Sequence, residues 1–162
     1  MKRDQRLYPL SWTHHDLLVY ADRVRMALTT NHPSYRYSVE SLIEKTREFW
    51  EAVFQGHRDA EKEVLFACLD LFPVFKIESG IVLKELDEIE GLYRQILEAS
   101  RDGEEVKTLL VRFAELITHH VRYEERELFP KIQKSLPETE MNWIGHELDL
   151  KLPRLCRTRP EK

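Results

Sequence analysis

The feature that most constrains the fold of this 162-residue chain is a short pattern that occurs twice. His57 and Glu61 stand four residues apart, and His120 and Glu124 repeat this spacing 63 residues later. A Leu-Phe dipeptide follows each pair at the same offset. Because residues four apart share one face of an α-helix, each imidazole lies one turn from its carboxylate. The repeat therefore predicts two helices with equivalent roles.

Four stretches of the chain repeat apolar residues at steps of three and four, which is the period of an amphipathic α-helix. Both His-Glu pairs lie on these apolar stripes and are expected to point inward. His14 lies on the first stripe, whereas His15 falls on a polar series. The four stripes are Leu10, His14, Leu17, Ala21, Val24 and Leu28; Leu42, Phe49, Val53, His57, Glu61, Val64 and Cys68; Ser79, Val82, Leu86, Ile89, Tyr93 and Ile96; and Leu110, Phe113, Ile117, His120, Glu124 and Leu128.

Segments rich in turn-forming residues separate the stripes. Residues 29–37 are expected to form a loop, Pro73 to end the second helix, and residues 100–103 to form a turn. Ser11 is expected to cap the first helix, and Pro130 to kink or shorten the end of the fourth. No strand-like alternation persists anywhere in the sequence.

These elements predict an all-α fold, an up-down-up-down four-helix bundle with a short C-terminal helix. A single domain is expected over residues 1–162. Within it, the bundle is expected over about residues 8–135, the short helix over about 137–150, and a flexible tail over 153–162. The two halves of the bundle align over about 64 residues each, as a duplicated helical hairpin would.

Composition narrows the classes of function. A net charge of −4 gives no reason to expect nucleic-acid binding, and no apolar run approaches the ~20 residues of a transmembrane helix. The chain is therefore expected to be cytoplasmic and to have no membrane partner. The two cysteines, Cys68 and Cys156, make no disulfide framework, and Cys68 is expected to be a small core residue.

Five polar side chains are expected to meet in the core at similar depth, namely His14, His57, Glu61, His120 and Glu124. Burying two carboxylates without partners costs several kcal/mol, and no Lys or Arg lies on the stripes near the pairs. A divalent cation removes that cost, and imidazole with carboxylate suits Fe, Zn or Mn. The alternative is that each histidine only hydrogen-bonds to the acid of its own helix. Glu125, about 100° from Glu124 on a helix, is expected to face solvent.

Three motifs carry a resemblance to a known family. They are Pro9-Leu10-Ser11-x-x-His14-His15, His57-x-x-x-Glu61-x-x-x-Leu65-Phe66 and His120-Val121-Arg122-x-Glu124-Glu125-Arg126-Glu127-Leu128-Phe129-Pro130. Across nearly its whole length the chain resembles the hemerythrin-like proteins with the His-His-Glu cation-binding domain. The resemblance implies a four-helix bundle that holds a non-haem di-iron centre. By position the metal ligands would be His14, His57, Glu61, His120 and Glu124, with the two carboxylates bridging.

The chain departs from that family's pattern at the start of the third helix. The family usually carries a histidine there after a glutamate, whereas Glu78 is followed here by Ser79. Because the two halves align His14 with Ser79, the iron served by His120 is expected to lack a second imidazole. A second metal is then expected to bind weakly, to need Glu78, water or another side chain as a ligand, or to be absent. The remaining candidates are expected on the surface, namely His15, His119 and His146.

The resemblance implies a protein that binds non-haem iron, as two ions or as one ion plus a weak second site, and that binds or senses dioxygen or a related small molecule. Zinc and manganese also suit these donors, and no oligomeric state is indicated. Two alternatives stay open. An open coordination position beside an apolar pocket would suit a di-iron oxidase or peroxidase, and a degraded metal site would leave an interaction protein. No catalytic residue besides the metal ligands is indicated.

Overall fold

The computed structural model describes residues 1–152 as helices joined by short turns, with no strand among them. Two long helices are α1 (Tyr8–Thr29) and α5 (Lys76–Glu98). Another runs through α2 (Val39–Phe49), η3 (Trp50–Phe54), α3 (Gln55–Ala60), η4 (Glu61–Phe66) and α4 (Ala67–Leu69). The last joins α6 (Glu104–Tyr123), η6 (Glu124–Leu128) and α7 (Phe129–Ser135). The shorter elements are α8 (Glu138–Lys151) and the 3-10 turns η1 (Gln5–Leu7), η2 (Pro33–Tyr35) and η5 (Pro73–Phe75).

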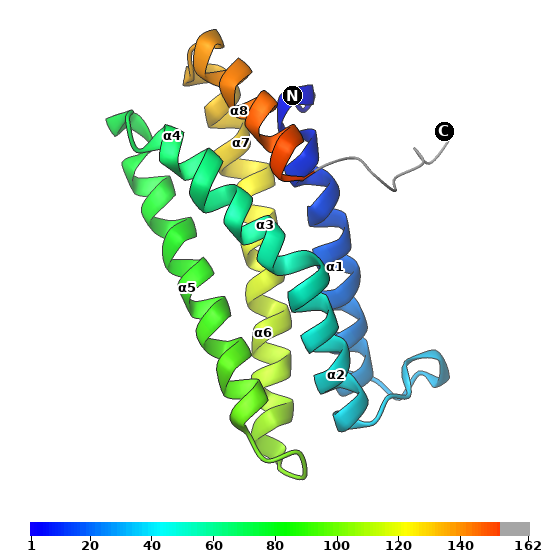
Figure 1. Cartoon of the computed structure of the whole chain (residues 1–162). Helices are drawn as coiled ribbons and strands as arrows, with labels where there is room; N and C mark the ends of the chain where they lie inside the picture. The colour runs from blue at the N-terminus through cyan, green and yellow to red at the C-terminus, as the bar shows by residue number, and fades with distance from the viewer. Residues whose placement is uncertain (153–162) are drawn as a thin grey trace.

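These helices form the predicted up-down-up-down bundle (Figure 1). Both α1 and α5 pack along α6, and α8 lies across the end of the bundle where α1 begins. The expected short C-terminal helix is therefore confirmed. The expected flexible tail at 153–162, with Cys156, lies outside the described residues. None of the described helices is long and apolar enough to cross a lipid bilayer.

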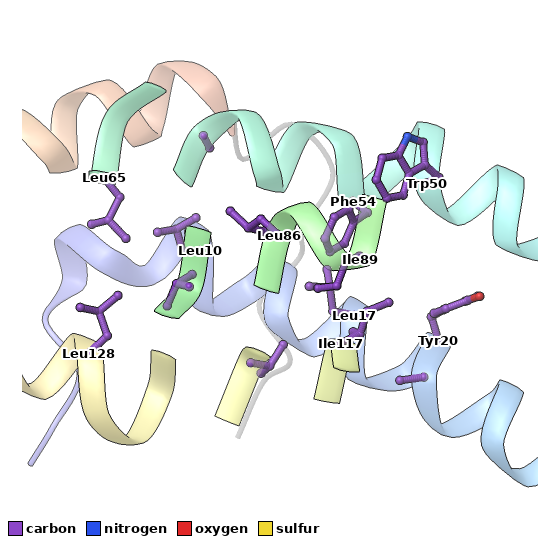
Figure 2. Close-up of a cluster of buried hydrophobic side chains, with 14 of the residues drawn as sticks. Leu10, Leu17, Tyr20, Trp50, Phe54, Leu65, Leu86, Ile89, Ile117 and Leu128 are labelled. Atoms are coloured by element: carbon purple, nitrogen blue, oxygen red, sulfur yellow. The ribbon is translucent and has the colours of Figure 1, made fainter. Parts of the chain in front are cut away.

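The predicted apolar stripes form the core of the bundle. Figure 2 shows this core along the bundle axis, from Leu65 and Leu128 at one end to Tyr20 and Trp50 towards the other. Cys68 is buried in the same core, as expected. Because burying each large apolar side chain contributes about 1.5–3 kcal/mol, this continuous core supplies the main stabilisation of the fold.

Three turns of the long helices are π-helical, with i→i+5 hydrogen bonds. η4 begins at Glu61 and η6 begins at Glu124, so the same distortion occurs at both repeated pairs. The third turn, η3, shifts the helical phase by one residue. Phe54 is therefore fully buried, and Val53, predicted on the stripe, is only half-buried. The stripe was wrong at that position because it assumed a regular 3.6-residue period.

The helix ends differ in two places from the sequence-based expectation. Ser38 caps α2, because its hydroxyl accepts a hydrogen bond from the Ser41 N–H at 3.0 Å. Ser11 is not a cap, since α1 begins at Tyr8 with a proline in its first turn, where the missing N–H costs nothing. Pro130 likewise occupies the first turn of α7, and the helix continues past it to Ser135. Pro130 therefore does not shorten the fourth helix.

α8 fixes the segment that precedes α1. A Cβ at Gly145 would lie 2.8 Å from the Cβ and Cγ of Arg6, so only glycine allows this close approach. Arg6 also donates hydrogen bonds to Glu138 and Asn142 of α8, each at 2.8 Å. These contacts hold the segment against the end of the bundle at which the candidate site lies.

Candidate metal centre

Five buried side chains converge in the bundle, and we refer to them as the ligand cluster. They are His14 from α1, His57 from α3, Glu61 from η4, His120 from α6 and Glu124 from η6. One nitrogen or oxygen atom from each lies within 4.8 Å of the corresponding atoms of the others. His14 is 2% exposed, and the other four are fully buried. The five residues singled out in the sequence therefore meet in one place.

The carboxylates of the ligand cluster lack ordinary partners. Glu61 Oε1 lies 2.5 Å from His57 Nε2 and 3.4 Å from His120 Nε2, yet within residues 1–152 neither Glu61 oxygen has a hydrogen bond of normal geometry. Glu124 Oε1 also lacks one, although its Oε2 lies 2.9 Å from His14 Nε2. The described ion pairs of both carboxylates involve imidazoles and no lysine or arginine. A cation among these oxygens would offset the cost of burying them.

A hydroxyl outside the ligand cluster orients His57. Thr13 Oγ1 donates to the Leu10 carbonyl oxygen at 2.8 Å and lies 2.6 Å from His57 Nδ1. Because a hydroxyl has a single hydrogen, the His57 Nδ1–H donates to Thr13. His57 Nε2 then carries a lone pair that faces Glu61 Oε1. Two electron-rich atoms this close require a positive charge between them, which a bound metal ion would supply.

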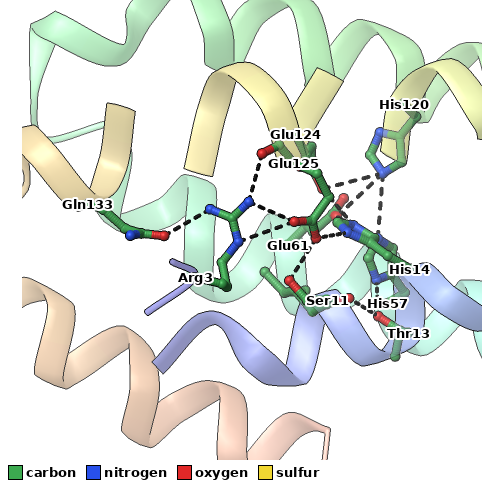
Figure 3. Close-up of polar contacts among 11 residues, drawn as sticks. Arg3, Ser11, Thr13, His14, His57, Glu61, His120, Glu124, Glu125 and Gln133 are labelled. Carbon is green, nitrogen blue, oxygen red and sulfur yellow. Dashed lines mark hydrogen bonds and ion pairs between the residues drawn. The ribbon is translucent and has the colours of Figure 1, made fainter. Parts of the chain in front are cut away.

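Glu125 holds His14 from outside the ligand cluster. The His14 Nδ1–H and the Ser11 hydroxyl both donate to Glu125 Oε1 at 2.7 Å, and Arg3 Nη2 donates to Oε2 at 2.7 Å (Figure 3). The expectation that Glu125 faces solvent was wrong. Contacts with Ser11, His14 and Arg3 keep the Glu125 side chain half-buried, at 29% exposed.

Burial and close charges shift the protonation of the ligand cluster. Burial, together with the charge of Glu61, raises the pKa of Glu124 to about 8. Burial would also raise the pKa of Glu61, but the nearby imidazoles hold it well below its usual range. Burial lowers the pKa of His57 to about 4, whereas hydrogen bonds to carboxylates overcome burial and raise the pKa of His14 well above its usual value. His57 is therefore neutral and ready to coordinate, while Glu124 holds a proton that a metal would displace.

Helix α5 contributes no residue to the ligand cluster as described in residues 1–152. Ser79 lies in the first turn of α5, and its buried hydroxyl oxygen has no hydrogen-bond partner in that range. Glu78, the expected substitute ligand, is bound to Lys131 with 2.5 Å between Oε1 and Nζ. The ammonium group of Lys131 thus neutralises Glu78. The histidines expected on the surface are exposed, namely His15, His119 and His146.

The comparisons with known proteins agree with this geometry. The family model described as the hemerythrin HHE cation binding domain matches residues 7–132, a range that contains the whole ligand cluster. No curated protein and no solved structure matches the chain. The family match and the buried cluster of three imidazoles and two carboxylates together support a metal-binding protein.

Proposed function

The chain belongs to the hemerythrin HHE cation-binding domain family, and from this premise we propose that its ligand cluster binds one non-haem iron ion tightly and thereby binds dioxygen or a related small molecule. One observation carries the proposal. Five buried donors converge, and their carboxylate oxygens have no other cation within the described residues. All five are proposed as metal ligands.

The spacing of the donors favours one ion over two. Bonds of about 2.1 Å place the donors of one ion at most about 4.2 Å apart. Two ions of a dinuclear site lie about 3.5–4 Å from each other, so their outer ligands spread further. Here the five donor atoms lie within 4.8 Å of one another, and the Nε2 atoms of His57 and His120 are 3.5 Å apart. This spread is only about 0.6 Å more than the span of one ion, so a small inward movement of the outermost donors would close them on a single metal. A second ion would also need a donor from α5, where Ser79 stands.

The surroundings of the ligand cluster suit a small, weakly polar ligand. Phe129 stacks on the ring of His14 with centroids 5.6 Å apart, and the ring of Phe54 lies 6.2 Å from that of His57. Both phenylalanines are fully buried and exclude water from the donors. The five side chains of the ligand cluster would hold the iron, which would supply the affinity for dioxygen. Zinc or manganese would fit the same donors without that affinity.

Metal analysis of the purified chain tests the proposal. Anaerobic titration with Fe(II) should reach one tight equivalent per chain, and exposure to air should then produce a new absorption band in the visible spectrum. His57→Ala should lower the iron affinity strongly. His146→Ala removes an exposed imidazole and serves as the matched control. Iron uptake that is equal in the two variants would contradict the site.

Other outcomes point to the alternatives. Two equally tight irons would support the dinuclear centre that the family resemblance implies. Turnover of peroxide by the iron-loaded chain would support an oxidase or peroxidase. A stable chain that takes up no metal would support an interaction protein with a degraded site.

A further inference from the structure

His14 is held on two sides by residues outside the ligand cluster. Its Nδ1–H donates to Glu125 Oε1 at 2.7 Å, and its ring stacks on Phe129 at an interplanar angle of 13°. Both contacts restrict rotation of the imidazole. As a result the opposite nitrogen, Nε2, points into the ligand cluster, where it lies 2.9 Å from Glu124 Oε2.

Arg3 contacts both of the residues that hold His14. Its Nε and Nη2 donate to Glu125 Oε2 at 3.2 and 2.7 Å, and Nη2 also donates to the Glu125 carbonyl oxygen at 2.7 Å. The guanidinium carbon lies 5.0 Å from the centroid of the Phe129 ring. A planar guanidinium that makes several bonds to one residue is directional, and a lysine could not reproduce it.

Arg3 is itself fixed to α7. Arg3 Nη1 donates to Gln133 Oε1 at 2.8 Å, and the same oxygen accepts from the Asp4 N–H at 3.1 Å. Gln133 Nε2 donates to the Lys2 carbonyl oxygen at 3.0 Å. The contacts therefore run from α7 through the segment before α1 to Glu125 and on to His14 (Figure 3).

The other two imidazoles of the ligand cluster are held differently. His57 Nδ1 donates to the neutral hydroxyl of Thr13, and His120 Nδ1 has no hydrogen-bond partner within residues 1–152. His14 instead donates to a carboxylate. A carboxylate that accepts from an imidazole fixes the tautomer and makes the opposite nitrogen a stronger metal donor.

We propose that Glu125 is a positioning residue for His14 and that Arg3 keeps Glu125 in place, so that the segment before α1 controls how firmly the metal is held. This inference rests on the proposed function, because it takes His14 as a metal ligand. It adds that the strength of the site depends on residues 1–7, which contribute no metal ligand themselves.

Cobalt(II) bound to the full chain is a suitable probe, because its visible absorption bands report coordination geometry. Glu125→Gln should speed the release of cobalt to a chelator by about 10–100-fold and shift those bands. Arg3→Gln should produce a smaller change in the same direction. The control is Arg101→Gln, which removes an arginine in the turn between α5 and α6 that pairs with Glu40 and Glu44, and it should change neither quantity.

Combining the two substitutions separates positioning from a general loss of stability. If Arg3 acts through Glu125, Arg3→Gln should not speed release further in a chain that already carries Glu125→Gln. Additive effects would overturn the role of Arg3. Unchanged bands and release in Glu125→Gln would overturn the inference while metal binding itself stands. A wild-type chain that binds no cobalt or iron would overturn the proposed function, and this inference with it.

Discussion

Replacing Glu124 with glutamine should stabilise the metal-free protein while weakening its hold on metal. Burial and the charge of Glu61 raise the pKa of Glu124 to about 8, against an ordinary value of 4.5. The folded chain therefore keeps this carboxyl protonated at pH 7, where the unfolded chain would ionise it. Each pKa unit corresponds to about 1.4 kcal/mol, and pH 7 lies about 2.5 units above the ordinary value. Glu124 thus costs about 3 kcal/mol of folding free energy at pH 7.

Glutamine has the shape of a protonated glutamic acid, and its carbonyl oxygen can accept the His14 N–H. The substitution therefore removes the cost of Glu124 without opening a cavity. We expect the metal-free variant to gain about 1–3 kcal/mol, with a rise in melting temperature of about 2–4 °C per kcal/mol. The cost is absent below pH 4.5, grows as the pH rises and is complete above about pH 8. The gain should accordingly vanish near pH 4.5 and be largest above about pH 8.

Thermal unfolding followed by circular dichroism, with a chelator and then with metal, provides the assay. Metal at about 100 times its Kd should stabilise the wild-type chain by about 2.7 kcal/mol. Glu124→Gln lacks one of five donors and should show a much smaller rise. Glu127→Gln, an exposed neighbour in the same π-helical turn, is the matched control and should alter neither measurement. A metal-free Glu124→Gln variant that is less stable than wild type at about pH 8 would refute the reasoning. So would a variant that metal stabilises as much as it stabilises the wild-type chain.

Three further predictions concern the same site. Metal uptake should release protons, because Glu124 is protonated below about pH 8, and calorimetric titration in two buffers measures that release. The apparent metal affinity should therefore rise from about pH 6 to pH 8, and an affinity that falls over this range would contradict the prediction. Thr13→Val should leave the His57 Nδ1–H without its acceptor and lower metal affinity about tenfold, whereas Thr13→Ser should retain it; equal dissociation constants would contradict this role. Ser79→His should raise the bound metal from one to two ions per chain by elemental analysis, whereas Ser79→Ala should leave it at one.

The helices, their inward faces and the members of the ligand cluster could be predicted from the sequence. The face on which a residue lies depends on spacing within a single helix, and that spacing is a local property of the chain. His57 and Glu61 share a face for this reason, and their repetition as His120 and Glu124 indicated a second equivalent helix. The same spacing placed His14 inward and His15 outward, as the structure confirms.

The role of Glu125 was decided by the tertiary structure. Its place in the helix predicts a side chain that faces solvent, but contacts from Ser11, His14 and Arg3 hold its carboxylate beside the ligand cluster. Arg3 meets Glu125 although the two are 122 residues apart in the chain, and no local pattern predicts such a contact. The sequence determined which residues face the centre, and packing between distant segments decided what holds them there.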